Sequence, residues 1–99
     1  MSLLVVRSEA EAEMQEGYDW YEERGPGVGS RFLDQVDRIF KEIHSAPHRY
    51  STVYRDVRMA LVRHFPYAIF YRINPSAVVV YSVFHTSRNP DIWKLRIED

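Results

Sequence analysis

The stretch YAIFYRINPSAVVVYSVFH, residues 67–85, decides the fold of this 99-residue chain. Its two halves, Tyr67–Ile73 and Ala77–His85, are rich in aromatic and β-branched side chains, which favour strands. The residues between them, Asn74-Pro75-Ser76, are typical of a tight turn. The stretch therefore predicts two antiparallel strands joined as a hairpin, on which the rest of the chain can pack.

Two further strands are predicted upstream of this hairpin. Polar and apolar residues alternate along Val57–Phe65, which is the pattern of a half-buried strand, and Pro66 ends the pattern. Near the N-terminus, the short apolar run Leu3–Arg7 predicts a first strand. We expect these strands to form a small, twisted and mostly antiparallel sheet.

The segment between the first two strands predicts a helical hairpin. Ser8 and Glu11 have the spacing of a capping box, and apolar residues then recur at helical spacing as far as Arg24. The glycine-rich segment Gly25–Gly29 is expected to stop this helix. A second helix follows and ends at Ala46-Pro47, because helices commonly end before proline. Two helices joined by so few residues must lie antiparallel.

These elements define an α+β fold with the order β-α-α-β-β-β. After them, Asn89-Pro90-Asp91 combines an N-cap, a first-turn proline and a favourable acid, and predicts a short C-terminal helix through Trp93. The length suits one domain and is too short for two. We therefore assign residues 1–99 to a single domain.

The composition excludes several classes of chemistry. The chain is 45% apolar and has no cysteine, so it can bury a core and can form neither disulfides nor thiolate sites. The longest apolar runs, Leu3–Val6 and Ala77–Tyr81, are too short to span a bilayer, and no signal peptide is evident. We expect a cytoplasmic protein with no membrane partner.

The charges are distributed unevenly although the formal net charge is only −1. Residues 1–46 hold five Arg and Lys against ten Asp and Glu, whereas residues 47–72 hold five Arg against one Asp. Such a dipolar pattern either keeps the protein soluble or marks a surface that binds an anionic partner.

Three local motifs are better explained by structure than by ligands. Gly25–Gly29 follows a helix and lacks the Gly-Lys-Ser/Thr ending of a phosphate loop. His44 and His48 have zinc-ligand spacing, but Pro47 ends the helix between them. We expect neither a metal nor a cofactor. Core packing accounts more readily than base stacking for the aromatic set Trp20, Tyr21, Tyr67, Phe70 and Tyr71.

The best candidate site is a group of cationic residues in and after the last three predicted strands: Arg58, Arg63, Arg72, His85 and Arg88. Strand interiors usually avoid arginine, so we expect these side chains on an open sheet face or edge. There, Arg58, Arg63, Arg72 and Arg88 could bind an anionic partner or nucleic acid. One interpretation of this group is metal-free RNA cleavage, in which His85 acts as acid or base and Arg63 and Arg88 clamp the phosphate. A solvated basic face is the other.

The sequence also resembles the ParE/RelE toxin superfamily, most closely its ParE-like plasmid stabilisation branch. The resemblance runs from about Val5 to Arg96 and rests on the order and spacing of several segments: Trp20-Tyr21-Glu22, the glycine-rich turn with Phe32-Leu33, Arg58, Phe65–Tyr71 and His85–Pro90. It implies a helical hairpin on an antiparallel sheet. It also implies a bacterial toxin that inhibits growth and is neutralised by a cognate antitoxin, with a homo-oligomer also allowed.

Members of this superfamily divide by target, and one residue bears on the choice. RelE-like toxins cut mRNA on the ribosome, whereas ParE-like toxins poison DNA gyrase. The RelE-like nucleases carry an arginine at the position that matches Ala68, and alanine offers no charge to a phosphate. Our leading hypothesis is a ParE-like toxin that binds gyrase. The alternatives are a metal-independent endoribonuclease and a non-toxic relative that only binds a partner.

Overall fold

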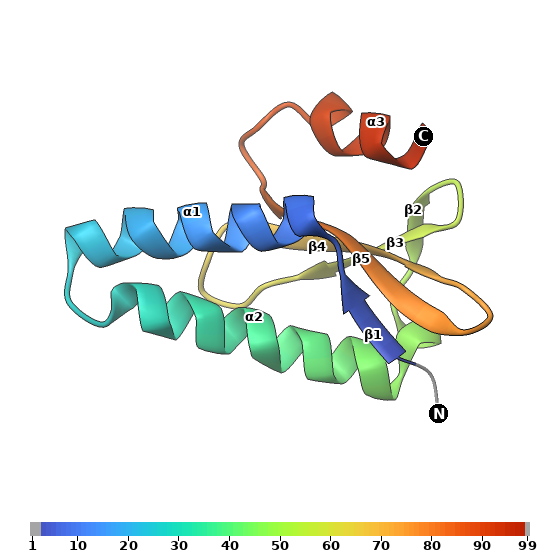
Figure 1. Cartoon of the computed structure of the whole chain (residues 1–99), viewed down its shortest axis with the longest axis horizontal. Coiled ribbons are helices and arrows are strands. Elements are labelled where there is room, and N and C mark those ends of the chain that lie inside the picture. The colour runs from blue at the N-terminus through green and yellow to red at the C-terminus, as the bar shows by residue number, and fades with distance from the viewer. Residues whose placement is uncertain (1–2, 99) are drawn as a thin grey trace.

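The computed structural model describes residues 3–98, without the side chain of Glu98. Along the chain come β1 (Leu3–Val6), α1 (Ser8–Arg24), α2 (Val28–Ser45), the short 3-10 helix η1 (Pro47–Arg49), β2 (Thr52–Tyr54), β3 (Val57–Leu61), β4 (Tyr67–Ile73), β5 (Ala77–His85) and α3 (Asp91–Glu98). The α+β class is therefore confirmed. Figure 1 shows α1 and α2 side by side as a long hairpin, with α3 on its own at the other side of the sheet.

The sheet has five strands in the order β1-β5-β4-β3-β2. The central hairpin, β4 and β5, has the bounds that the sequence predicts, and all neighbouring pairs are antiparallel except β1 with β5. β1 pairs with only the first half of β5, from Leu3 opposite Ala77 to Val6 opposite Val80. A bulge at Tyr81 follows directly. The second half of β5 therefore has α1, and no strand, along this edge.

The two faces of the sheet carry two separate cores. On one face, the apolar stripe of α2 and Ala10 of α1 pack on residues such as Ile69, Tyr71 and Val83. On the other face, Trp93 and Ile97 of α3 cover a cluster with Phe70. The ring of Trp93 stacks on that of Phe70 at 3.8 Å and 15°. The strands thus alternate their side chains between the hairpin and α3, as a doubly covered sheet requires.

Two glycines let α1 and α2 approach closely. A Cβ on Gly17 would lie 2.6 Å from Cε2 of Phe32, and a Cβ on Gly29 would lie 2.7 Å from the backbone oxygen of Tyr18. The connection is short, and Glu22 of α1 accepts hydrogen bonds from the amides of Gly27 and Gly29 at 3.0 and 2.9 Å. The glycine-rich segment therefore serves helix packing.

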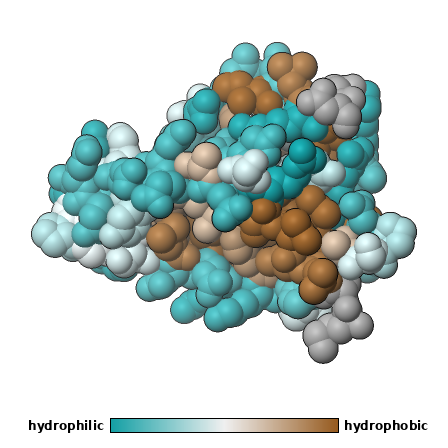
Figure 2. All heavy atoms as spheres, viewed as in Figure 1, coloured by the Kyte–Doolittle hydropathy of each residue, from teal (hydrophilic) through white to brown (hydrophobic). Residues whose placement is uncertain are grey.

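Hydrophobic side chains also remain on the surface. Figure 2 shows them gathered near β1 and on the outer side of α3, whereas the far end of the hairpin is hydrophilic. They include Leu3 and Val5 on β1, and Ile92 and Leu95 on α3.

The structure corrects the sequence-based elements at four points. β2 is an additional strand that the sequence did not predict. β3 ends at Leu61, before the predicted Phe65, because the chain turns at His64, which has a positive φ of 69°. The capping box does not form: Arg7 is the N-cap, without a side-chain cap, and the Ser8 hydroxyl donates to Glu9 instead. Finally, α3 continues beyond Trp93 to Glu98.

Candidate functional site: a pocket beside the second half of β5

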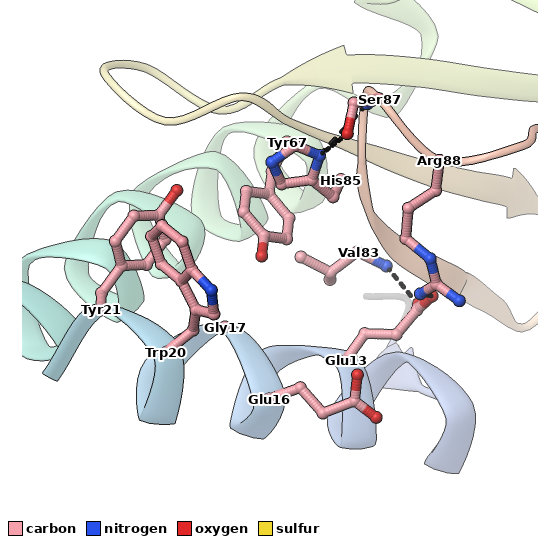
Figure 3. A pocket seen from close by; sticks show the side chains of 10 residues that line it. All are labelled: Glu13, Glu16, Gly17, Trp20, Tyr21, Tyr67, Val83, His85, Ser87 and Arg88. Carbon is pink, nitrogen blue, oxygen red and sulfur yellow. Dashed lines mark hydrogen bonds and ion pairs between the residues drawn. The ribbon is translucent and has the colours of Figure 1, made fainter. Parts of the chain in front are cut away.

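A pocket of about 300 Å³ lies where β1 has ended and α1 borders β5. We call it the α1–β5 pocket; Figure 3 shows its lining. Its walls come from α1, from the start of β4, from the end of β5 and from the loop after β5, and most of the lining is apolar. The lining residues are Glu13, Glu16, Gly17, Trp20, Tyr21, Tyr67, Val83, His85, Ser87 and Arg88.

His85 is the imidazole of this pocket, and its neighbours fix its orientation. The ring packs edge-on against Tyr67 at 5.1 Å. The backbone amide of Ser87 donates to Nδ1 at 3.1 Å, and the Ser87 hydroxyl lies 2.8 Å from the same atom. An amide can only donate, so Nδ1 accepts and the proton of the neutral ring sits on Nε2. His85 is therefore held as a hydrogen-bond donor through Nε2.

Glu13 is a buried carboxylate whose oxygens are already occupied. Oε1 accepts hydrogen bonds from the Ser82 hydroxyl at 2.8 Å and from the Val83 amide at 3.1 Å. The guanidinium of Arg96 donates to Oε1 and Oε2 at 3.0 and 3.1 Å. The carboxylate thus takes the place of a strand beside β5, because it satisfies an amide that β1 leaves unpaired. Arg88 approaches it only to 3.9 Å.

Tyr67 forms one wall of the pocket with a hydroxyl that stays protonated. Burial, reinforced by Tyr21 and by the carboxylates of Glu16 and Glu13, raises its pKa above the ordinary value of 10.0, although Arg88 acts in the opposite direction. At neutral pH the hydroxyl is a neutral donor.

The structure brings together only two of the five cationic residues that the sequence indicated. His85 and Arg88 line the α1–β5 pocket. Arg58 donates to the backbone oxygens of Tyr50 and His48 at 2.5 and 3.3 Å, on the hairpin side of the sheet. Arg72 is bound to Asp56 at 2.6 Å. Arg63 lies 3.8 Å from Glu42. The five side chains therefore do not share one open face or edge of the sheet.

Arg63 instead borders a second hollow, of about 550 Å³, between α2 and the outer edge of β3. We call this the β3-edge concavity. It combines exposed apolar side chains with two arginines and one acid, and it is lined by Ile39, Glu42, Arg49, Tyr50, Ser51, Val53, Met59, Leu61 and Arg63. The Arg63 side chain is 60% exposed. Arg63 and His85 thus line two different hollows.

Sequence reasoning missed Glu13 and Arg96, which organise this end of β5. One signal was available for Glu13: it lies on the buried side of α1, three residues after Ala10 and four before Gly17. A charged residue on such a stripe needs a partner, because an unpaired buried charge is very costly. No such pattern marks Arg96 on its short helix.

The comparisons with known proteins agree with the fold. A family model described as "ParE toxin of type II toxin-antitoxin system, parDE" matches residues 4–90. Among solved structures, the chain is similar to one described as "Chromosomal ParDE TA system from P. aeruginosa", with a TM-score of 0.77 and 16% sequence identity, over 86% of this chain and 96% of that chain. No curated protein sequence matches significantly.

Together, the fold and the family match define a toxin of a type II toxin–antitoxin system. The chain belongs to the ParE toxin family. Membership of such a system implies an antitoxin as partner. Within residues 3–98, no helix is long and apolar enough to cross a membrane.

Proposed function

We propose that this toxin arrests growth in the cytoplasm by binding DNA gyrase, and that a cognate antitoxin neutralises it by covering its surface. Its place in the ParE family supports this choice over the other known target of the superfamily, mRNA on the ribosome.

The observation that carries the proposal is the environment of Ala68. Its side chain is only 2% exposed and belongs to the cluster of Phe70, Phe84 and Trp93. RelE-like nucleases have an arginine at the matching position. Here α3 covers this part of the sheet, so position 68 offers neither a guanidinium nor an open face to hold a phosphate. The arrangement favours action by binding.

The placement of the other candidate residues also favours binding. A nuclease built from His85, Arg63 and Arg88 needs all three around one phosphate. Arg63 lines the β3-edge concavity, and His85 and Arg88 line the α1–β5 pocket. His85 and Arg88 do share a pocket, so a metal-independent endoribonuclease that relies on these two residues is the second candidate.

For the antitoxin we propose contact at the β3-edge concavity. Leu61 and Val53 expose apolar surface there, 59% and 48% of each residue, beside the guanidinium of Arg63. An amphipathic segment with acidic residues matches this combination. Arg58 and Arg72, which the sequence analysis also assigned to this contact, are engaged by other groups. We therefore give Arg63 the main electrostatic role.

The test compares two readouts after induced expression of the toxin without its antitoxin. We expect growth arrest with filamentation and DNA-damage signalling, and inhibition of gyrase supercoiling by the purified protein. The alternative predicts cleaved messages, detected by primer extension, that disappear in the His85→Ala variant. Cleaved messages together with normal supercoiling would contradict the gyrase proposal.

A further inference from the structure

The hydroxyl of Tyr67 is one of the hydrogen-bond donors of the α1–β5 pocket. Tyr67 as a whole is only 9% exposed, and it lines the pocket from the start of β4. A Cβ on Gly17 would lie 3.1 Å from this oxygen, so the hydroxyl sits over the bare backbone of α1 inside the pocket. At neutral pH this hydroxyl can donate a hydrogen bond to an acceptor on a ligand.

Two further donors line the same pocket. Because the Ser87 amide occupies Nδ1 of His85, the ring presents the Nε2 proton. The Arg88 side chain is 46% exposed, and its contact with Glu13 is long at 3.9 Å because Arg96 already saturates that carboxylate. Figure 3 shows His85 beside Tyr67, with Arg88 past Val83 and next to Glu13. Tyr67, His85 and Arg88 can all donate to acceptors of a bound ligand, and Arg88 adds the positive charge that a carboxylate needs.

The remaining walls of the pocket suit an aromatic ring. Trp20 and Tyr21 lie beside Gly17, and Trp20 is half exposed at the mouth. Pockets that bury drug-sized ligands measure about 300–1,000 Å³, so this one is at the lower limit. It has room for one large side chain with its neighbour in sequence.

The charge around the pocket decides between a protein and a nucleic acid. α1 has the sequence SEAEAEMQEGYDWYEER, with seven acids and one arginine at its end. A phosphate backbone would bring repeated negative charge along this helix and would be repelled. A single carboxylate beside Arg88, with neutral or basic residues around it, avoids that repulsion.

We infer that the α1–β5 pocket binds an aromatic side chain with an adjacent carboxylate, presented by a protein partner of the toxin. The inference rests on one part of the proposed function, namely that the toxin acts by binding proteins. It adds a contact site separate from the β3-edge concavity.

The experiment titrates blocked dipeptides into the purified full-length chain and follows backbone amide and Trp20 indole signals by NMR. The probe is acetyl-Phe-Glu-amide. Its controls are acetyl-Phe-Gln-amide, which lacks the charge, acetyl-Ala-Glu-amide, which lacks the ring, and phenylacetate, which is a free aromatic acid. We expect saturable shifts at Gly17, Val83 and Ser87, and affinity at least about fivefold weaker for each of the three controls.

Variants then assign the contacts. Tyr67→Phe removes only the hydroxyl, and Arg88→Gln removes only the charge; each should weaken acetyl-Phe-Glu-amide about fivefold or more. Arg38→Gln is the matched control, because it removes an exposed arginine of α2 outside this pocket, and it should bind as the parent does.

Three results would overturn the inference: no shifts at the pocket with millimolar probe, equal binding of the Phe-Gln peptide, or tighter binding of phenylacetate than of the dipeptide. None of these depends on gyrase. A chain that binds the probe but leaves gyrase supercoiling intact would contradict only the proposed function. A chain that inhibits supercoiling but does not bind the probe would contradict only the inferred ligand of the pocket.

Discussion

Glu13 and Arg96 are 83 residues apart in the sequence and form a two-pronged ion pair that joins α1 to α3 past the end of β1. Arg96 also donates to the backbone oxygen of Tyr81, the bulged residue of β5, at 3.3 Å. The pair is thus the point where both layers of helices meet the sheet.

Removal of one partner of this pair should destabilise the fold. Glu13 is almost fully buried, so Glu13→Gln leaves the guanidinium of Arg96 without its counter-charge and weakens two further hydrogen bonds. We expect the free energy of unfolding to fall by about 2–4 kcal/mol. Urea denaturation measures it, and Glu11→Gln, exposed on the same helix, should stay within about 0.5 kcal/mol of the parent. Equal stability of both variants would show that the pair contributes nothing.

The close approach of the two long helices should not tolerate a methyl group at Gly29. An alanine there gains helix propensity, but its Cβ would lie 2.7 Å from a backbone oxygen that cannot rotate away. We expect Gly29→Ala to cost about 1–3 kcal/mol in thermal or urea unfolding. Gly25→Ala is the control, since Gly25 has an extended φ of −177° and its Cβ would meet only a side-chain methyl group of Val28, at 3.0 Å. A stabilised Gly29→Ala variant would refute this packing argument.

The attachment of α3 should depend chiefly on Trp93. Its ring stacks on Phe70 and contacts Tyr54, and its loss would leave a cavity over the sheet. Trp93→Ala should cost about 3–5 kcal/mol and should make Lys94 and Arg96 accessible to trypsin. The neighbouring Ile92, which is partly exposed, provides a control: Ile92→Ala should cost much less. Unchanged proteolysis of Trp93→Ala would mean that other contacts hold the helix.

Stability should fall at alkaline pH because of Tyr71. Burial raises its pKa from 10.0 to about 12, an effect that Arg58 opposes and Tyr50 assists. Between pH 10 and 12 the unfolded chain loses this proton while the folded chain keeps it, so stability is complete below pH 10 and declines as pH rises through 12. The full decline is about 2–3 kcal/mol for this residue.

Unfolding midpoints in urea at pH 9, 10 and 11 measure this decline. In Tyr71→Phe, the midpoint should fall less steeply with pH than in the parent. This variant also loses the hydrogen bond from the hydroxyl to the Pro47 oxygen, so its stability at pH 9 should be lower. A parallel slope in parent and variant would assign the effect to the other buried tyrosines.

The sequence predicts the central elements well because local signals and tertiary packing agree there. Tyr67–Ile73 and Ala77–His85 combine strand-forming side chains with a clear turn, and both strands have the predicted bounds. Thr52–Tyr54 is too short to show a period, and it becomes a strand only through pairing with β3. The apparent alternation beyond Leu61 is broken by a turn at His64, which no periodicity reveals.

The candidate site was harder to predict because arginine side chains reach far from their backbone positions. Arg58, Arg63 and Arg72 lie near one another in sequence, yet each is neutralised or held by a different element. The sequence does single out His85 and Arg88, which share a pocket. The position of Glu13 on the buried stripe of α1 indicates that it needs a partner, but not that it completes this region from the other end of the chain.

The family match ends at Pro90, and α3 begins at the next residue. Residues 91–98 thus lie outside the matched span, yet Trp93 and Ile97 cover Phe70 and Phe84, and Arg96 holds Glu13 of the hairpin. Loss of α3 would expose the apolar side chains of Phe70 and Phe84 to water and would leave the buried Glu13 carboxylate without its guanidinium, so this short segment is needed by both faces of the sheet.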